Sequence, residues 1–359
     1  MDILPGKKFV EYVDQRPQKK REEFSDELQY NQGDRDLEPY FAPLARDAGG
    51  NIPTPDISKL RKALRAGILT CTGVRLYSAL ISDHWKMREA AVKALLEFIE
   101  NPLLPRYFNK TLALFQTCIE VAKLACEDKV IQIYVEGLKL LSTCLAPPIC
   151  GNDVDPGLIQ KSVAYFIPRY IKKISELNLR ARDLTMNTLI SVFKHPALNI
   201  GDLVKGCMDI VERQEGLTPD KQPPNMLLAR LEVVLHVLEE YGIDEGLWDW
   251  YPVFTELIIP SLFHQNPSCR LVSVEICVLL YKLVGEDIKI IINDLSNLKP
   301  NMKENIISRF SDLDVTFKKE LNISQQIEEK NINNSKAKIF GKNNNSLDPI
   351  IETNLEKEL

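Results

Sequence analysis

The stretch SDHWKMREAAVKALLEFI, residues 82–99, decides the fold of this chain. It opens on a polar break, after which apolar residues recur at helical spacing: Ala91, Leu95, Leu96, Phe98 and Ile99. Such spacing places the apolar side chains on one face of an α-helix, which must pack against a neighbour. The stretch therefore predicts the second helix of a helical pair, beginning near Trp85.

The same pattern, a polar break followed by an apolar helical stripe, recurs over residues 59–315. The breaks fall at residues 82–86, 126–129, 176–180, 223–226, 265–270 and 298–301. They lie roughly 33 to 51 residues apart, and HEAT and armadillo repeats span about 40–47 residues, with atypical repeats at the ends. The apolar residues show no alternation of period two, the pattern that would indicate strands. We therefore predict an all-α fold, an α-solenoid of about six helical pairs whose breaks line one edge.

The two flanking segments lack this pattern. Residues 1–58 are polar, with a charge run at 19–23 and helix breakers at Pro53 and Pro55, and we expect an extended, partly disordered arm. Within the arm, residues 37–44 are apolar enough either to pack on the chain's own domain or to bind a partner. Residues 316–359 are rich in Asn, Lys and Glu and cannot bury enough apolar surface to offset their ordering entropy, so we expect a disordered tail.

The composition is that of a globular protein, with 45% hydrophobic and 26% charged residues. The net charge of -5 argues against a nucleic-acid partner, which would need a basic surplus. The N-terminus lacks the apolar core of a signal peptide, and no apolar run is long enough to span a bilayer, so we expect no membrane association. The eight cysteines form no C-x-x-C pair, and we expect buried, reduced thiols in the cytoplasm or cytoskeleton.

The sequence offers no motif for catalysis. It contains no phosphate-binding loop, no G-x-S-x-G elbow and no H-E-x-x-H pair. We therefore expect no catalytic residues, no cofactor and no metal site. An enzyme with an unrecognised site is the weakest alternative, and a cleft of convergent polar groups with shifted pKa values would support it.

Trp85 stands at the mouth of the first break, with Lys86 and Arg88 beside it. Tryptophan and arginine side chains supply much of the binding energy of protein interfaces. Trp85 can equally cap the solenoid core, and spacing alone does not decide between the two roles. Trp248 and Trp250 present a similar choice between packing the fifth pair and forming a second binding patch.

The sequence resembles the TOG-domain family at several breaks. Trp85 followed by Arg88-Glu89-Ala90-Ala91 is similar to the opening repeat of that family, residues 176–183 resemble its third loop, and residues 266–270 resemble the start of a late repeat. The resemblance covers residues 60–315 and is nearest to the TOG arrays of centrosomal proteins found at ciliary tips. TOG domains are arrays of HEAT-like repeats that bind tubulin through their intra-repeat loops. The resemblance thus implies this fold, with tubulin or a microtubule as the partner.

The resemblance also implies which residues contact the partner. Trp85 takes the aromatic role of the first loop, and basic residues at successive breaks supply the rest: Lys86, Arg88, Lys129, Arg180, Arg182, Arg270 and Lys303. Because tubulin is acidic, a basic row would steer and orient it. Two departures stand out, since Glu127 and Asp128 make the second loop partly acidic, and the fourth loop, residues 216–225, shows no match.

The function that follows is non-catalytic tubulin or microtubule binding in the cytoskeleton, in a cilium, axoneme or centrosome, together with other ciliary or centrosomal proteins. The alternative is a generic HEAT or armadillo scaffold that binds a protein other than tubulin. A basic ridge anchored by a tryptophan favours tubulin, whereas an apolar concave groove favours a peptide-binding adaptor.

Overall fold

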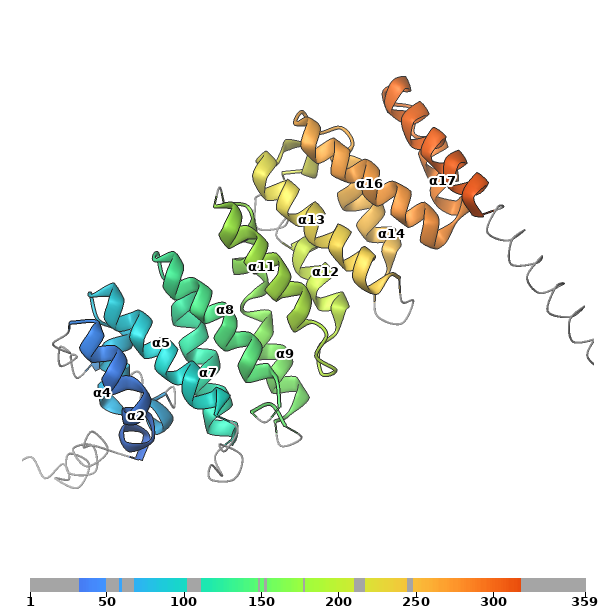
Figure 1. Ribbon diagram of the computed structural model, residues 1–359. Coiled ribbons are helices and arrows are strands. Elements are labelled where there is room, and N and C mark those ends of the chain that lie inside the picture. The colour runs from blue at the N-terminus through green and yellow to red at the C-terminus, as the bar shows by residue number, and fades with distance from the viewer. Residues whose placement is uncertain are drawn as a thin grey trace, which may run out of the picture. The chain divides into compact units, whose positions relative to one another are not determined.

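The computed structural model describes residues 32–49, 58–59, 68–101, 111–147, 149–151, 154–176, 178–209, 217–243 and 248–317. Every regular element in these ranges is a helix, which confirms the all-α prediction (Figure 1). The chain divides into two compact units, Met1–Ser273 and Val274–Leu359. The expected tail beyond residue 317 and the expected arm before residue 32 lie outside the described residues.

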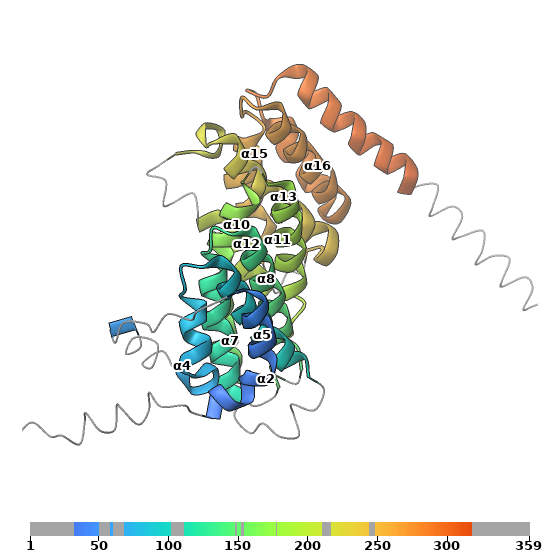
Figure 2. The same cartoon turned by 60° about the vertical axis from the view of Figure 1, so that its left-hand side comes forward.

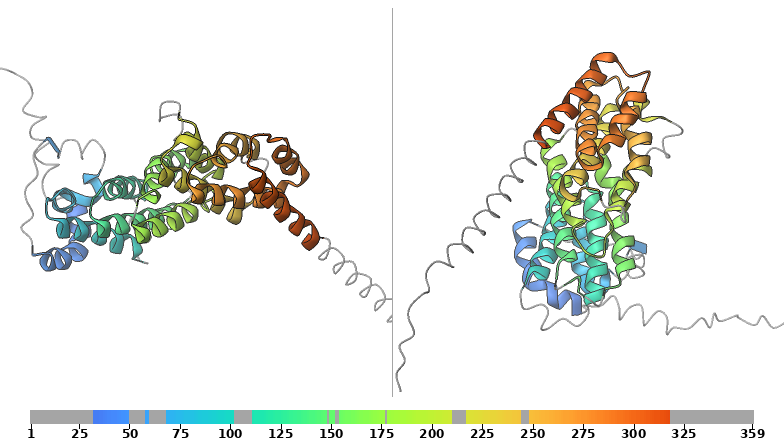
Figure 3. Two further views of the ribbon diagram at one scale, coloured as in Figure 1. Left: turned by 90° about the horizontal axis from the view of Figure 1, so that it is seen from above. Right: turned by 90° about the vertical axis from the view of Figure 1, so that its right-hand side faces the viewer.

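The helices of the first unit form two layers. The second helices of successive pairs pack side by side in one layer: α5 (Trp85–Glu100), α8 (Ile131–Leu145), α11 (Leu179–Val192) and α13 (Pro224–Tyr241). The first helices form the other layer: α4 (Leu69–Leu80), α7 (Thr111–Cys126), α9 (Pro156–Ala164), α10 (Ile167–Ile174) and α12 (Ile200–Asp209) (Figure 2). The left view of Figure 3 shows the two layers from above. This arrangement is an α-solenoid, as predicted.

The predicted breaks coincide with helix boundaries. In the first unit they separate α4 from α5, α7 from α8, α10 from α11 and α12 from α13. The short helix η1 (Pro219–Lys221) comes just before the fourth break. The fifth break follows a helical stretch made of α14 (Trp250–Val253), the π-helical turn η2 (Phe254–Ile258) and α15 (Ile259–Ser261), and it precedes α16 (Pro267–Val284). The helical spacing of the apolar residues and the polar breaks between them were therefore sufficient to locate these helix boundaries.

Two helix starts show why the chain turns where it does. The Asn178 side-chain oxygen accepts a hydrogen bond of 3.1 Å from the amide of Ala181, which caps α11. The Asn266 side-chain oxygen accepts one of 2.8 Å from the amide of Ser268, and Pro267 is the first residue of α16. Asparagine and proline suit these positions because the first amides of a helix have no partner within it.

Residues 32–47 correct the expectation of an extended arm. They form α2 (Gln32–Asp47), which packs on α4 and α5. Leu37 and Phe41 are fully buried, and the side-chain amide (Nδ2) of Asn101 donates a hydrogen bond of 2.7 Å to the Tyr40 hydroxyl. The apolar patch at 37–44 thus packs on the chain's own domain. The two prolines inside α2 lie on its exposed side, so they mark no boundary.

The pairing of α7 with α8 depends on a glycine. A Cβ atom added at Gly137 would lie 2.5 Å from the Cβ of Ala125, a distance that real side chains do not reach. The two helices therefore approach more closely at this point than any larger residue permits.

We expect Gly137→Val to destabilise the protein by about 2 to 3 kcal/mol, since overpacking would force α7 and α8 apart. Chemical denaturation followed by circular dichroism measures this. Gly151→Val is the matched control, because nothing lies within 4 Å of a Cβ at that position. Equal midpoints for the two variants would show that the close approach is not required.

The second unit contains the end of α16, α17 (Glu286–Asp294) and a helix over residues 300–317. The Tyr281 and Phe310 rings stack with centroids 4.1 Å apart, and the Tyr281 hydroxyl donates a hydrogen bond of 2.7 Å to Asp314. Gly285 ends α16 with φ of 90°, a conformation that favours glycine. Over most of its length the last helix exposes polar side chains, at Asn301, Glu304, Asn305, Ser308, Ser311 and Asp312.

Three further features bear on function. Within the described part of the chain, no helix is long and apolar enough to cross a bilayer, and no group of His, Cys, Asp or Glu could hold a metal ion. All eight cysteines are free, and all but Cys126 are buried. Burial raises the pKa of Cys126 and of Cys207 to about 12, so these thiols stay protonated and unreactive.

Candidate functional site

The breaks of the first unit line up along one edge, because the second helices lie side by side and begin there (Figure 1). Contacts join neighbouring second helices: Arg88 of α5 to Asp128 just before α8, the Tyr134 hydroxyl of α8 to that of Thr185 in α11, and Arg182 of α11 to Glu232 in α13. We call this edge the loop ridge and define it as residues 81–88, 127–134, 175–182, 217–227 and 262–271. It is the surface on which the predicted contact residues of the first unit stand.

Trp85 is the first residue of α5 and is 38% exposed. Met87, two positions further on, is fully buried and fills the core beneath it. The ammonium group of Lys86 lies 5.9 Å from the centre of the indole ring, and Lys86 is itself exposed. Part of the indole ring is thus covered by the chain, and the rest is open to a partner, so the exposure makes the contact role available to Trp85.

Arg88 is bonded within the chain. Its Nε and Nη2 donate to the two carboxylate oxygens of Asp128, at 2.7 and 3.1 Å. Its Nη1 donates to the backbone carbonyls of Ser82 and Asp83, at 2.8 and 3.1 Å. Such a bidentate, charge-assisted pair is strong and directional. Arg88 therefore fixes the conformation of the first break and links it to the second break.

The same helix position recurs at two other breaks. Arg270 is the fourth residue of α16, as Arg88 is of α5, and its Nη1 donates to the carbonyls of His264 and Gln265 at 2.7 and 2.6 Å. Arg182 is the fourth residue of α11 and forms an ion pair with Glu232 of α13. Three arginines predicted to face a partner thus have intramolecular partners that position the ridge.

We expect Arg88 and Asp128 to be coupled in a double-mutant cycle. The bidentate pair is mostly shielded from water, so Arg88→Ala and Asp128→Ala should show a coupling of about 1 to 2 kcal/mol in unfolding free energy. Urea denaturation of the two single variants and the double variant measures it. Additive effects would show that the pair does not fasten the two breaks together.

The second break is less acidic at its surface than its sequence indicates. Asp128 is neutralised by Arg88, while Glu127 accepts hydrogen bonds from the Tyr165 hydroxyl and from Arg169 Nε. These two bonds lower the pKa of the Glu127 carboxyl, and the bond from Tyr165 contributes most. Lys129 is exposed between these pairs. The charge that this break presents is thus positive.

Unpaired cations stand at four successive breaks. The side chain of each is exposed and forms no ion pair or hydrogen bond with another described residue: Lys86, Lys129, Arg180 and Lys221. Sequence reasoning missed Lys221, because the fourth break shows no family match. The only signal was a polar break before the Pro223-Pro224 helix start. Lys303 lies in the second unit, where its ammonium donates a hydrogen bond to the Asn293 carbonyl at 2.5 Å.

A fully buried arginine anchors the fourth break. Arg230 Nε donates to the Cys207 carbonyl at 2.6 Å, and Nη1 donates to the Gln222 side-chain oxygen at 2.5 Å. The Gln222 carbonyl in turn lies 3.0 Å from His264 Nε2, which joins the fourth break to the fifth. Burial lowers the pKa of Arg230 to about 10. Helical spacing does not identify this arginine as buried, because it lies within an otherwise apolar stripe.

The loop ridge also gathers exposed apolar side chains. In the first unit, those on the ridge are Trp85, Leu179, Leu217, Phe263 and Leu271. Apolar groups flanked by unpaired charges are typical of protein-binding surfaces. Trp248, by contrast, is buried, which supports a packing role for it in the fifth pair.

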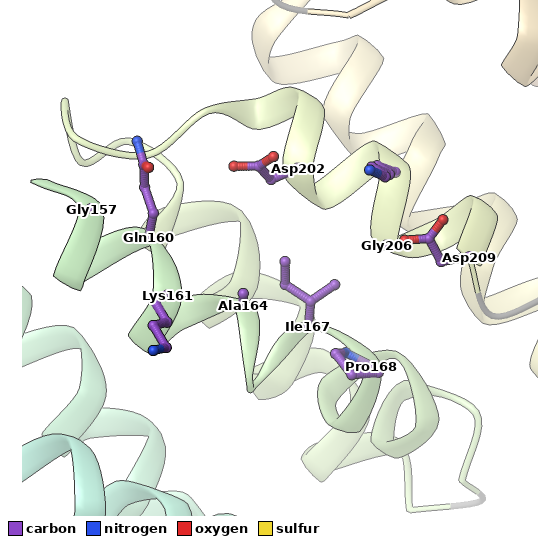
Figure 4. Close-up of a pocket in the computed structure, with 10 residues that line it drawn as sticks. Gly157, Gln160, Lys161, Ala164, Ile167, Pro168, Asp202, Gly206 and Asp209 are labelled. Carbon is purple, nitrogen blue, oxygen red and sulfur yellow. The ribbon is translucent and has the colours of Figure 1, made fainter.

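An open groove of about 610 Å³ lies away from the ridge, between α9 and α10 on one side and α12 on the other (Figure 4). Figure 4 shows Gln160 and Asp202 near one end and Pro168 and Asp209 near the other. A Cβ at Gly206 would lie 2.4 Å from Ile167, so α12 can approach α10 only with glycine there. Its lining includes no histidine, cysteine or hydroxyl side chain and mixes both charges. The groove therefore offers no serine, threonine or cysteine nucleophile and no histidine base.

The paired layers, with their loops aligned on one edge, define the class: the chain has the fold of a TOG domain. The solved TOG domain of human Cep104 superimposes with a TM-score of 0.55 at 17% identity, over 73% of this chain and 98% of that one. TOG3 of Mini spindles from Drosophila melanogaster gives 0.51 at 15%, over 66% and 92%, and the TOG domain of Zyg9 from C. elegans gives 0.50 at 14%, over 82% and 95%. At these identities the likeness concerns the fold.

Comparisons that use the sequence alone find no relative, in contrast to the comparison of structures. No protein-family profile matches it, and no curated protein matches it either.

Proposed function

We propose that this chain is a non-catalytic tubulin-binding protein that holds tubulin through the loop ridge. One observation carries the proposal. On a TOG-domain fold, an exposed Trp85–Lys86 pair begins a row of unpaired cations that continues through the next three breaks. A single apolar anchor beside spaced positive charges suits a large, acidic protein surface.

The parts of the ridge contribute differently. An exposed ion pair is worth about 1 kcal/mol or less, so Lys129, Arg180 and Lys221 would mainly speed and orient the encounter. Trp85 can bury a large apolar area and would dominate the affinity. Binding would therefore weaken moderately as salt is raised, without being abolished.

Three arginines support binding through bonds inside the chain and not through contact with the partner: Arg88, Arg182 and Arg270. Their intramolecular bonds fix the breaks before a partner arrives. A preformed surface loses less conformational entropy on binding than a mobile one. We therefore assign these three arginines a positioning role and leave direct contact to the exposed residues.

The proposed setting is the cytoskeleton, at the cilium or centrosome, where other proteins of those structures could bind alongside tubulin. Imaging of the tagged chain in ciliated cells tests this. Signal at centrosomes or along axonemes supports the setting, and diffuse signal unaffected by microtubule loss contradicts it.

A binding assay with two forms of tubulin tests the function. The purified chain is mixed with free tubulin dimers and analysed by size-exclusion chromatography, and in parallel it is sedimented with stabilised microtubules. We expect a complex with at least one form that weakens as salt is raised. Absence of binding to both forms would reject the tubulin function and favour the adaptor alternative.

A further inference from the structure

Leu179 lies at the third break and takes little part in the packing around it. It is the first residue of α11 and is 66% exposed. Asn178, not Leu179, caps the helix, and Ala181 provides the buried contact of the first turn. A leucine exposed to this extent gives up the free energy that burial would supply.

The position of Leu179 matches that of Trp85. Each is the first residue of a second helix, and each is followed by an exposed, unpaired cation, Arg180 in one case and Lys86 in the other. Both helices belong to the same layer, with α8 packed between them. The ridge therefore presents two apolar–basic pairs in the same register, two repeats apart.

A hollow of about 90 Å³ opens beside Leu179. Its apolar lining comes from Ile174, Leu179, Leu228 and Ala229, and its polar rim includes Arg182 and Glu176. Pockets for small-molecule ligands measure about 300 to 1,000 Å³, so this hollow is too small for one. It suits a single side chain, as the pockets that receive interface anchors do.

Among the charged residues at the third break, one cation, Arg180, is available to a partner. Arg182 is paired with Glu232, and Glu176 lies 2.7 Å from the ammonium of Lys173. Arg180 is exposed and has no such partner among the described residues. Arg180 is thus the charged residue of this helix start that remains available to an acidic partner.

We propose that Leu179 and this hollow receive an apolar side chain of tubulin, and that Arg180 binds a carboxylate beside it. This second anchor rests on the proposed function. With Trp85 it would hold tubulin at two points of the ridge, and two apolar contacts separated by two repeats would specify orientation as well as affinity.

Affinity measurements with purified tubulin test the second anchor. We expect Leu179→Ala to weaken binding at least tenfold, with an unchanged melting temperature and an unchanged dependence on salt. Arg180→Ala should weaken binding less and reduce the dependence on salt, because it removes a charge. Leu179→Met, which keeps an apolar side chain of similar size, should bind nearly as tightly as wild type.

Leu112→Ala is the matched control, since Leu112 is an exposed leucine at the start of α7, outside the ridge. If Leu179→Ala binds like wild type while Trp85→Ala is weakened, the second anchor is wrong and the proposed function stands. An equal loss in Leu112→Ala would also overturn the second anchor. If the wild-type chain binds no tubulin, both proposals fail.

Discussion

Trp85→Ala should weaken tubulin binding by about 30-fold or more, because truncating a dominant interface residue costs at least about 2 kcal/mol. The indole ring is exposed at the first position of α5, and the core beneath it is filled by Met87. Removing the ring leaves the fold intact, and the unfolding free energy should fall by no more than about 1 to 2 kcal/mol, the cost of the buried part of the ring. Titration of labelled tubulin with each variant measures the affinity.

Tyr251→Ala provides the control for this loss. Tyr251 is a large exposed aromatic residue, but it belongs to α14 and lies outside the loop ridge. Its removal should leave the affinity unchanged. A Trp85→Ala variant that binds as tightly as wild type, or a Tyr251→Ala variant that loses as much, would remove Trp85 from the interface.

Arg230→Ala should have the largest effect on stability, a loss of about 2 to 4 kcal/mol. The substitution leaves the Cys207 carbonyl and the Gln222 side chain without their buried donor, and it opens a cavity at the base of the fourth break. Because Gln222 also contacts His264, the fifth break should loosen with the fourth. Guanidinium denaturation measures the loss, and hydrogen exchange of residues 217–223 and 262–266 shows where it falls.

Arg230→Met separates the two contributions of this arginine. Methionine restores most of the volume and carries no charge into the interior, so this variant should be more stable than Arg230→Ala. Arg180→Ala, at an exposed position, should leave stability unchanged. If Arg230→Ala unfolds at the same denaturant concentration as wild type, the buried arginine is not the anchor of the fourth break.

Helical pairing could be read from the chain because its signals are local. A stripe of period 3.6 and a polar break are both properties of neighbouring residues, so α5 begins at Trp85 as expected. The helix α2 was missed because the polar composition of residues 1–58, with its charge run at 19–23, indicated an extended arm. Leu37, Phe41 and Ala45, spaced by four and all buried, were the signal that could have identified it.

The candidate site was only partly predictable, since its pairing is not local. Arg88 meets Asp128 across 40 residues, and Arg182 meets Glu232 across 50. Spacing along the chain therefore identifies a basic residue at a break but not whether a carboxylate from the next repeat neutralises it. The same contacts explain why the second break, acidic in sequence, exposes Lys129.

Site-specific cross-linking tests the tubulin-facing ridge most directly. A photoreactive residue is placed at Lys86 in one variant and at Glu97 in another. Both side chains are exposed on α5, with Lys86 on the ridge and Glu97 toward the other end of the helix. We predict a covalent tubulin adduct from position 86 and none from position 97. Adducts from position 97 alone, or from both positions equally, would contradict the account.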